Sequence, residues 1–278
     1  MNTTPATLRV QDNLHRLADS EGICIEIFNA LTSDLLLDVV ESLLPDHRER
    51  LFPPTETLAM FIGQALSADR SCQAIVDRAA VQRLTGGLPV CSTHTGGYCR
   101  ARKRLPMEMV RELTGHLGHS MHRQVPDDWQ WRGRPVRIID GTTLTMPDTP
   151  TNQALYPQQS SQAEGLGFPI CRLLGVTSLA SGALLNAAVG PFAGKGGDEQ
   201  SLLRSLQETF DSGDILLGDA YFASYFFIAD MQAKGVDLIM EQLGGRKRVT
   251  DFRRGHRLGE RDHLIVLEKP KQKPHWMS

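Results

Sequence analysis

Apolar residues recur at helical spacing through the first part of the chain. Between about residues 29 and 124 they return every three or four positions, which is the spacing of one buried helix face. Polar and charged residues fill the remaining positions, so each helix is expected to be amphipathic. The expected helices end before Pro45, cover 56–66 with Thr55 as the N-cap, cover 71–84 and 93–104, and resume after Pro106.

The pattern changes near Val125, where a polar linker leads to Pro135. Beyond it, short β-branched runs bounded by glycine and polar residues indicate buried strands, and two helical segments separate them. Thr145 to Pro169 is expected to form a long loop, which is usually functional or disordered. The expected fold is therefore a helical N-terminal region followed by a mixed α/β layer. The strands are expected at 136–140, 171–179, 183–189, 215–219, 236–240 and 263–268, and the helices at 199–210, with Asp198 as the N-cap, and 223–234.

Composition narrows the class of protein. The chain has 278 residues, of which 41% are hydrophobic, so it can fill one large core or two ordinary ones. A net charge of -2 does not by itself indicate nucleic-acid binding, so any DNA-binding surface must be a local cluster of basic residues. Five cysteines without a CxxC motif favour a reduced, cytoplasmic protein. No signal peptide and no apolar run near the ~20 residues of a membrane span is visible, so no membrane partner is expected.

Two aspartates stand out because each closes an apolar run and precedes a turn. Asp140 ends Val-Arg-Ile-Ile-Asp and Asp219 ends Ile-Leu-Leu-Gly-Asp. Carboxylates at the carboxyl ends of neighbouring strands can hold Mg²⁺ or Mn²⁺, because these hard cations prefer oxygen ligands. Two-metal sites of this kind cut and join phosphodiester bonds. The alternative is that each aspartate only caps a turn or the following helix.

Two basic groups are candidates for contact with DNA. One follows Gly245, and its alternative interpretation is a solvated hairpin whose charges prevent edge pairing. The other ends the helix expected at 93–104, where cations also suit the helix dipole. The first group comprises Arg246, Lys247, Arg248, Arg253, Arg254 and Arg257, and the second Arg100, Arg102, Lys103 and Arg104.

Other motifs give weaker signals. The Gly-Lys-Gly-Gly-Asp stretch at 194–198 lacks the order of a phosphate-binding loop, so a flexible turn is expected. His116, His119 and His122 recur every three residues, but side chains with this spacing drift around a helix and rarely converge on a metal. Cys91, His94 and Cys99 match no zinc pattern.

Several longer stretches together resemble one family. They include Leu-Phe-Pro-Pro-Thr-Glu-Thr-Leu at 51–58, Leu-Ser-Ala-Asp-Arg-Ser-Cys-Gln at 66–73 and Thr-Gly-Gly-Tyr-Cys-Arg-Ala-Arg at 95–102. Others are Asp-Gly-Thr-Thr at 140–143, Met-Pro-Asp-Thr-Pro-Thr-Asn-Gln at 146–153, Gly-Pro-Phe at 190–192 and Asp-Phe-Arg-Arg-Gly at 251–255. The chain thereby resembles insertion-sequence transposases of the IS4 type, which belong to the DDE group and have an RNase H-like core.

The resemblance implies roles for these residues. Asp140 and Asp219 would be the first and second catalytic carboxylates and would bind Mg²⁺ or Mn²⁺ during DNA cleavage and strand transfer. The partners implied are double-stranded DNA, as terminal inverted repeats and target, and a second copy in a synaptic complex on the bacterial nucleoid. The expected domains are a DNA-binding helical domain at 1–125, an incomplete RNase H-like core at 126–243 and the start of a β-rich insertion at 244–278.

The chain departs from the family pattern at two points. Ala220 stands where the family usually has an arginine after the second aspartate. The third carboxylate is expected in a Tyr-x₂-Arg-x₃-Glu-x₆-Lys segment, yet no tyrosine here is followed three positions later by arginine. We therefore expect a truncated transposase with impaired cleavage. The alternatives are a non-catalytic DNA-binding remnant that interferes with intact transposase, and an RNase H-like nuclease unrelated to transposition.

Overall fold

The structure is a computed structural model, and it divides into two compact units between Leu113 and Thr114. In the part of the chain that it describes, no helix is long and apolar enough to cross a membrane. Arg246, Lys247 and Arg248 lie outside the described residues. The described residues are 29–34, 36–46, 51–89, 91–163, 165–194, 196–242, 251–260, 262–272 and 274.

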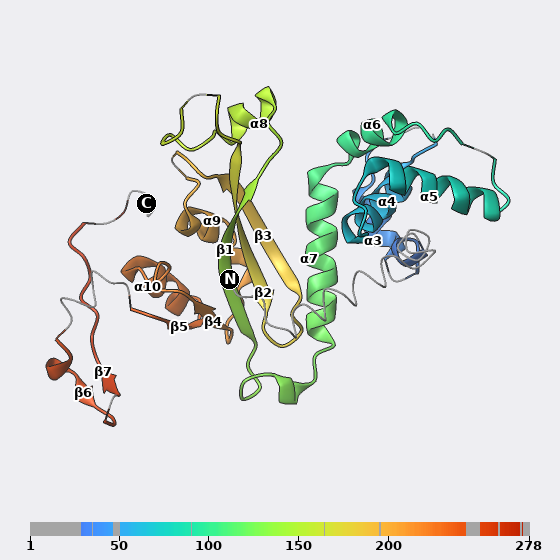
Figure 1. Cartoon of the computed structure of the whole chain (residues 1–278). Helices are drawn as coiled ribbons and strands as arrows, with labels where there is room; N and C mark the ends of the chain where they lie inside the picture. The colour runs from blue at the N-terminus through green and yellow to red at the C-terminus, as the bar shows by residue number, and fades with distance from the viewer. Residues whose placement is uncertain are drawn as a thin grey trace. The chain divides into compact units, whose positions relative to one another are not determined.

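The first unit is helical, as the apolar spacing predicts (Figure 1). Its apolar stripes bury two clusters, one around Met60, Ile75 and Tyr98 and the other around Leu31, Leu58 and Met109. The helices are α3 (Leu37–Leu43), α4 (Pro54–Leu66), α5 (Cys72–Thr85), α6 (Gly96–Arg104) and the first turns of α7 (Met107–Arg123).

The start of α4 differs from the expectation. Thr55 is not the N-cap, because the helix already begins at Pro54 and Pro53 occupies the cap position. Proline suits the first helical position, since its fixed φ matches the helix and its missing N–H has no partner there anyway. Thr57 completes the turn by donating its hydroxyl proton to the Pro53 carbonyl at 2.7 Å.

The second unit is built on a mixed five-stranded sheet with strand order β3-β2-β1-β4-β5 (Figure 1). β2 runs antiparallel to both of its neighbours, β1 and β3, whereas β4 runs parallel to β1 and β5 parallel to β4. This sheet confirms the expected mixed α/β, RNase H-like class of fold. The strands are β1 (Val136–Thr145), β2 (Ile170–Ser178), β3 (Leu184–Pro191), β4 (Ile215–Gly218) and β5 (Asp237–Met240).

Two helices, α9 (Glu199–Ser205) and α10 (Tyr225–Ala233), cover one face of this sheet. Their apolar side chains share a buried cluster with strand residues that include Ile139 and Leu216. Asp198 caps α9 as predicted, accepting a hydrogen bond from the Ser201 amide at 3.0 Å. The helix expected to reach residue 210 ends earlier and continues as a 3₁₀ turn, η2 (Gln207–Thr209).

The remaining elements are short. The long loop after β1 contains one short helix, α8 (Pro150–Leu155), and a 3₁₀ turn, η1 (Asp127–Trp129), precedes the sheet. Near the end of the chain, η3 (Phe252–Arg254) leads to a two-stranded ribbon of β6 (His256–Arg257) and β7 (His263–Leu264). The strand expected over 263–268 is therefore confined to its first two residues.

Candidate active site

Asp140 lies within its strand and not at the end, which corrects the expectation from sequence. β1 continues to Thr145, and Asp140 pairs with Gly175 of β2. On its other side, β1 pairs with β4 only from Val136 to Ile138. Among the described residues, β1 forms ladder pairs beyond Ile138 only with β2, and from Asp140 onward most of its side chains are exposed, so the apolar run stops. The polar residues after Ile139 therefore mark the end of β4 and not a turn in β1.

The parallel register of β1 and β4 brings the two aspartates together. The last aligned pair is Ile138 with Leu217, and Asp140 and Asp219 are each two residues further along. Contact persists past that pair, because a Cβ on Gly218 would meet Ile139 Cγ1 at 2.8 Å. Neighbouring strands are about 4.8 Å apart. The two predicted site residues thus lie side by side where β4 ends.

Each aspartate keeps one oxygen available. Asp140 Oδ1 accepts a hydrogen bond from the Gly141 amide at 2.8 Å, and Asp219 Oδ1 accepts one from the Tyr221 amide at 2.9 Å. Both residues are exposed, and neither Oδ2 has a hydrogen-bond partner among the described residues. Two oriented carboxylates with outward oxygens suit a hard divalent cation, which completes its shell with water. The residues present therefore fit Mg²⁺ or Mn²⁺.

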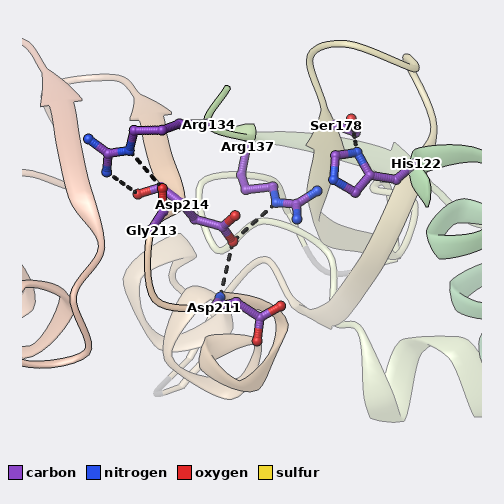
Figure 2. Close-up of polar contacts among 7 residues, drawn as sticks. All are labelled: His122, Arg134, Arg137, Ser178, Asp211, Gly213 and Asp214. Atoms are coloured by element: carbon purple, nitrogen blue, oxygen red, sulfur yellow. Dashed lines mark hydrogen bonds and ion pairs between the residues drawn. The ribbon is translucent and has the colours of Figure 1, made fainter. Parts of the chain in front are cut away.

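A buried ion pair ties β1 to the turn before β4 (Figure 2). Arg137 Nε donates to Asp214 Oδ2 at 3.1 Å, and the same oxygen accepts the Asp211 amide at 3.0 Å. Figure 2 shows Arg137 lying between Asp214 and His122. The pair fixes the parallel register near its start and so sets which residues meet further along the strands.

Arg134 extends this arrangement toward β5 (Figure 2). It donates from Nε to the Gly213 carbonyl at 2.9 Å and from Nη2 to the Asp214 carbonyl at 3.3 Å. Its Nη1 also lies 2.7 Å from Asp237 Oδ2 at the start of β5. Two arginines thus hold the amino ends of all three parallel strands.

Another acid beside this part of β1 is Glu199, the first residue of α9. A Cβ on Gly141 would lie 2.6 Å from Glu199 Cδ, so the Glu199 side chain passes directly over this glycine. Side chains alternate along a strand, so Glu199 lies on the face opposite Asp140. Its carboxylate is 3.6 Å from Arg172 Nε. Glu199 is therefore a partner of Arg172 and not a third ligand, and no sequence signal indicated this contact.

The histidines on α7 form no metal site. Among the described residues, no three His, Cys, Asp or Glu side chains are grouped to hold an ion. His122 Nδ1 instead lies 3.0 Å from the Ser178 hydroxyl. Burial, reinforced by the charge of Arg137, lowers the pKa of His119 and of His122.

The basic group on α6 divides into an outward and an inward part. Arg100, Lys103 and Arg104 are exposed. Arg102 turns inward, donating to Gln64 Oε1 at 3.0 Å and stacking over the Phe61 ring at 4.8 Å. Three cations of the four are thus presented to solvent.

The described part of the first basic group, which follows Gly245, is well exposed. Arg253 donates to Asp251 at 2.8 Å, Arg254 lies 3.8 Å from the same carboxylate, and Arg257 lies on β6. The Arg253 hydrogen bonds, with help from Arg254, lower the pKa of Asp251. This acid offsets part of the local positive charge.

The class of protein follows from these features. The mixed sheet is that of an RNase H-like fold, and it carries two adjacent aspartates where β4 ends. The transposase DDE domain family matches residues 131–276, more than half of the chain. The chain belongs to this family, which confirms the resemblance found in the sequence.

Two curated relatives come from Escherichia coli K12. The transposase InsG for insertion sequence element IS4 is 26% identical over 230 residues, covering 82% of this chain and 50% of InsG. The putative transposase InsZ is 28% identical over 140 residues, covering 49% of this chain and 45% of InsZ. The chain thus spans about half the length of each relative. The similarity to InsG supports the IS4 type.

A weak likeness to a solved structure was also found. The piggyBac transposase synaptic complex with hairpin DNA is 8% identical, with a TM-score of 0.34, and the likeness covers 86% of this chain and 52% of that one.

Proposed function

We propose that this chain acts on the DNA ends of an insertion sequence, with Asp140 and Asp219 as the carboxylates that hold a divalent cation. The observation that supports this most strongly is the register that sets both aspartates side by side at the end of β4. A cation bound there would neutralise phosphate charge and activate an attacking water or 3′ hydroxyl. The protein's own contribution is to orient the two carboxylates and to keep one oxygen of each free.

The electrostatic part of the proposal concerns DNA binding. The net charge of -2 leaves attraction to phosphates to local groups, of which α6 and the η3–β6 segment are the candidates. We propose that Arg100, Lys103 and Arg104 contact the duplex backbone directly, whereas Arg102 supports α6 from inside. A second copy in a synaptic complex, and a cytoplasmic location on the nucleoid, belong to the same proposal.

A second candidate function is DNA binding without efficient cleavage. It is favoured by the lack of any three-ligand group among the described residues. Two carboxylates hold a metal more weakly than three, and a displacement of about 1 Å can cost about 10²-fold in rate. Such a chain would occupy terminal repeats and compete with a fully active transposase.

Metal binding is the first test. Mn²⁺ titrated into the full chain should bind at a site that weakens by at least about tenfold in Asp140→Asn and in Asp219→Asn, the loss seen even for outer partners of a metal. Asp128→Asn, an exposed aspartate in η1, is the matched control and should bind as wild type does. Equal binding by all four proteins would refute the metal site.

Cleavage separates the two candidate functions. A duplex carrying the sequences that flank the chain's own gene should be bound, and Mg²⁺ or Mn²⁺ should produce nicks that Asp219→Asn abolishes. Binding without nicks, equal in wild type and Asp219→Asn, favours the non-catalytic function. Nicking of arbitrary DNA or of RNA:DNA hybrid would instead indicate a nuclease unrelated to transposition.

A further inference from the structure

Two cysteines of the first unit, far apart in sequence, meet at the start of α5. Cys72 is the first residue of α5, and Cys99 lies on α6 one turn before Arg102. Gln64 Nε2 and Arg102 Nη1 each donate to Cys72 Sγ at 3.6 Å. Cys99 lines the same pocket as Cys72, and Cys72 lies close enough to help raise the pKa of Cys99. The two thiols are thus direct neighbours.

Their surroundings admit a small reagent. Both thiols are half-buried and line a pocket of about 410 Å³. Phe61 and Val110 form part of its apolar wall, while Arg102 and Lys103 make it positively charged. A negatively charged molecule of modest size matches this combination.

We propose that Cys72 and Cys99 form a dithiol site that reacts with an anionic low-molecular-weight disulfide, such as oxidised glutathione, and closes into a Cys72–Cys99 disulfide. This reaction is independent of the DNA role proposed above. Burial, together with the neighbouring Cys72 side chain, raises the pKa of Cys99. Cys99 therefore keeps its proton, and Cys72, which accepts from Arg102, attacks first.

The exchange proceeds in two balanced steps. The Cys72 sulfur loses its proton and attacks one sulfur of the reagent, which breaks the reagent's S–S bond and releases one glutathione thiolate. Cys99 then loses its proton and attacks the Cys72 sulfur of the mixed disulfide, expelling the second glutathione thiolate. The two protein thiols lose two electrons, the reagent gains them, and both protons pass to the released thiolates.

The wild-type protein provides the main test. The reduced full chain is treated with oxidised glutathione, the remaining thiols are blocked, and the peptides are mapped. We expect an intact protein that has lost two hydrogens, with residues 72 and 99 in one linked peptide pair. Linkage through Cys24, Cys91 or Cys171, or no linked pair, would overturn the proposal whether or not any variant folds.

Variants then test the order of attack. Cys99→Ser should stop at the first step and carry one glutathione on Cys72, whereas Cys72→Ser should react slowly. Cys171→Ser, which removes a buried thiol of the second unit, should still give the linked pair. A linked pair formed faster from the neutral bis(2-hydroxyethyl) disulfide than from oxidised glutathione at low salt would contradict the role of Arg102 and Lys103. The expected preference for the anionic reagent is about tenfold.

Discussion

Arg137 and Asp214 form an ion pair inside the second unit, with Arg137 Nε 3.1 Å from Asp214 Oδ2 and side chains only 5% and 2% exposed. Arg137 Nη1 has no hydrogen-bond partner among the described residues, so Asp214 provides the main compensation for this buried charge. The pair connects β1, which carries Asp140, with the start of β4, which Asp219 directly follows, so its loss would affect the fold and the site together.

The first prediction concerns this pair. Asp214→Asn or Arg137→Met should lower the free energy of unfolding of the second unit by about 3–5 kcal/mol, because each leaves an uncompensated buried group. The double variant should cost less than the sum of the single variants, since neither charge then remains. Urea unfolding followed by circular dichroism measures all three.

A surface pair provides the control. Arg111 Nη1 lies 4.0 Å from Glu108 Oε2 on α7, and both side chains are largely exposed. Arg111→Met should therefore change stability by less than about 1 kcal/mol. Losses of similar size for Arg111→Met and Arg137→Met would contradict the importance of burial.

The second prediction is a pH dependence set by His119 and His122. Burial lowers the pKa of each in the folded state, so between pH about 6.5 and the lowered pKa the unfolded chain binds more protons than the folded one. The free energy of unfolding should therefore be unaffected by these two histidines above pH 7, and it should fall as the pH drops through that window. Urea unfolding at a series of pH values between 7.5 and 5 measures this slope.

Variants of the histidines test the assignment. In His119→Gln and His122→Gln the slope between pH 7 and 5.5 should become shallower, because one titrating group is removed in each. His94→Gln, an exposed histidine of the first unit, should leave the slope of the second unit unchanged. Stability that rises as the pH falls through this window would refute the assignment.

The sequence predicted the parts of the fold that depend on local pattern. The Asp198 cap, the apolar strands and the position of Asp219 after β4 all follow from neighbouring residues. The sequence predicted Asp140 at the end of its strand, which is wrong. The apolar residues stop where β4 ends, although β1 itself continues. Arg137 and Asp214 are 77 positions apart, and nothing local pairs an arginine in an apolar run with a distant aspartate.

The third prediction concerns the contact between α7 and β3. A Cβ on Gly118 would lie 2.0 Å from the Leu184 carbonyl oxygen, and backbone cannot yield as a flexible side chain can. Gly118→Ala should therefore destabilise the second unit by about 2 kcal/mol or more, although alanine normally favours a helix by about 1 kcal/mol. Gly115→Ala, with a contact of 3.3 Å, should be much closer to neutral. Thermal unfolding measures the loss of stability in each variant. Equal losses in Gly118→Ala and Gly115→Ala would contradict the close approach at Gly118.

The fourth prediction separates the outward and inward cations of α6. Lys103→Ala should weaken DNA binding and reduce the slope of log K against log salt by about 0.9, because one phosphate contact is lost. Thermal stability should stay within about 0.5 kcal/mol, since Lys103 is exposed. Arg102→Lys should do the reverse. It loses the planar group that stacks on Phe61 and donates to Gln64, so the first unit should be destabilised with little change in the salt slope.

Fluorescence anisotropy with a labelled duplex at several salt concentrations measures the slope, and thermal unfolding measures stability. A salt slope unchanged in Lys103→Ala would support the alternative that this group only complements the helix dipole. A salt slope that falls in Arg102→Lys while stability is retained would show that Arg102 reaches the DNA despite its inward contacts. The pair of variants thus assigns each cation by two independent measurements, and the α6 surface is a DNA contact only if Lys103→Ala changes the first measurement and not the second.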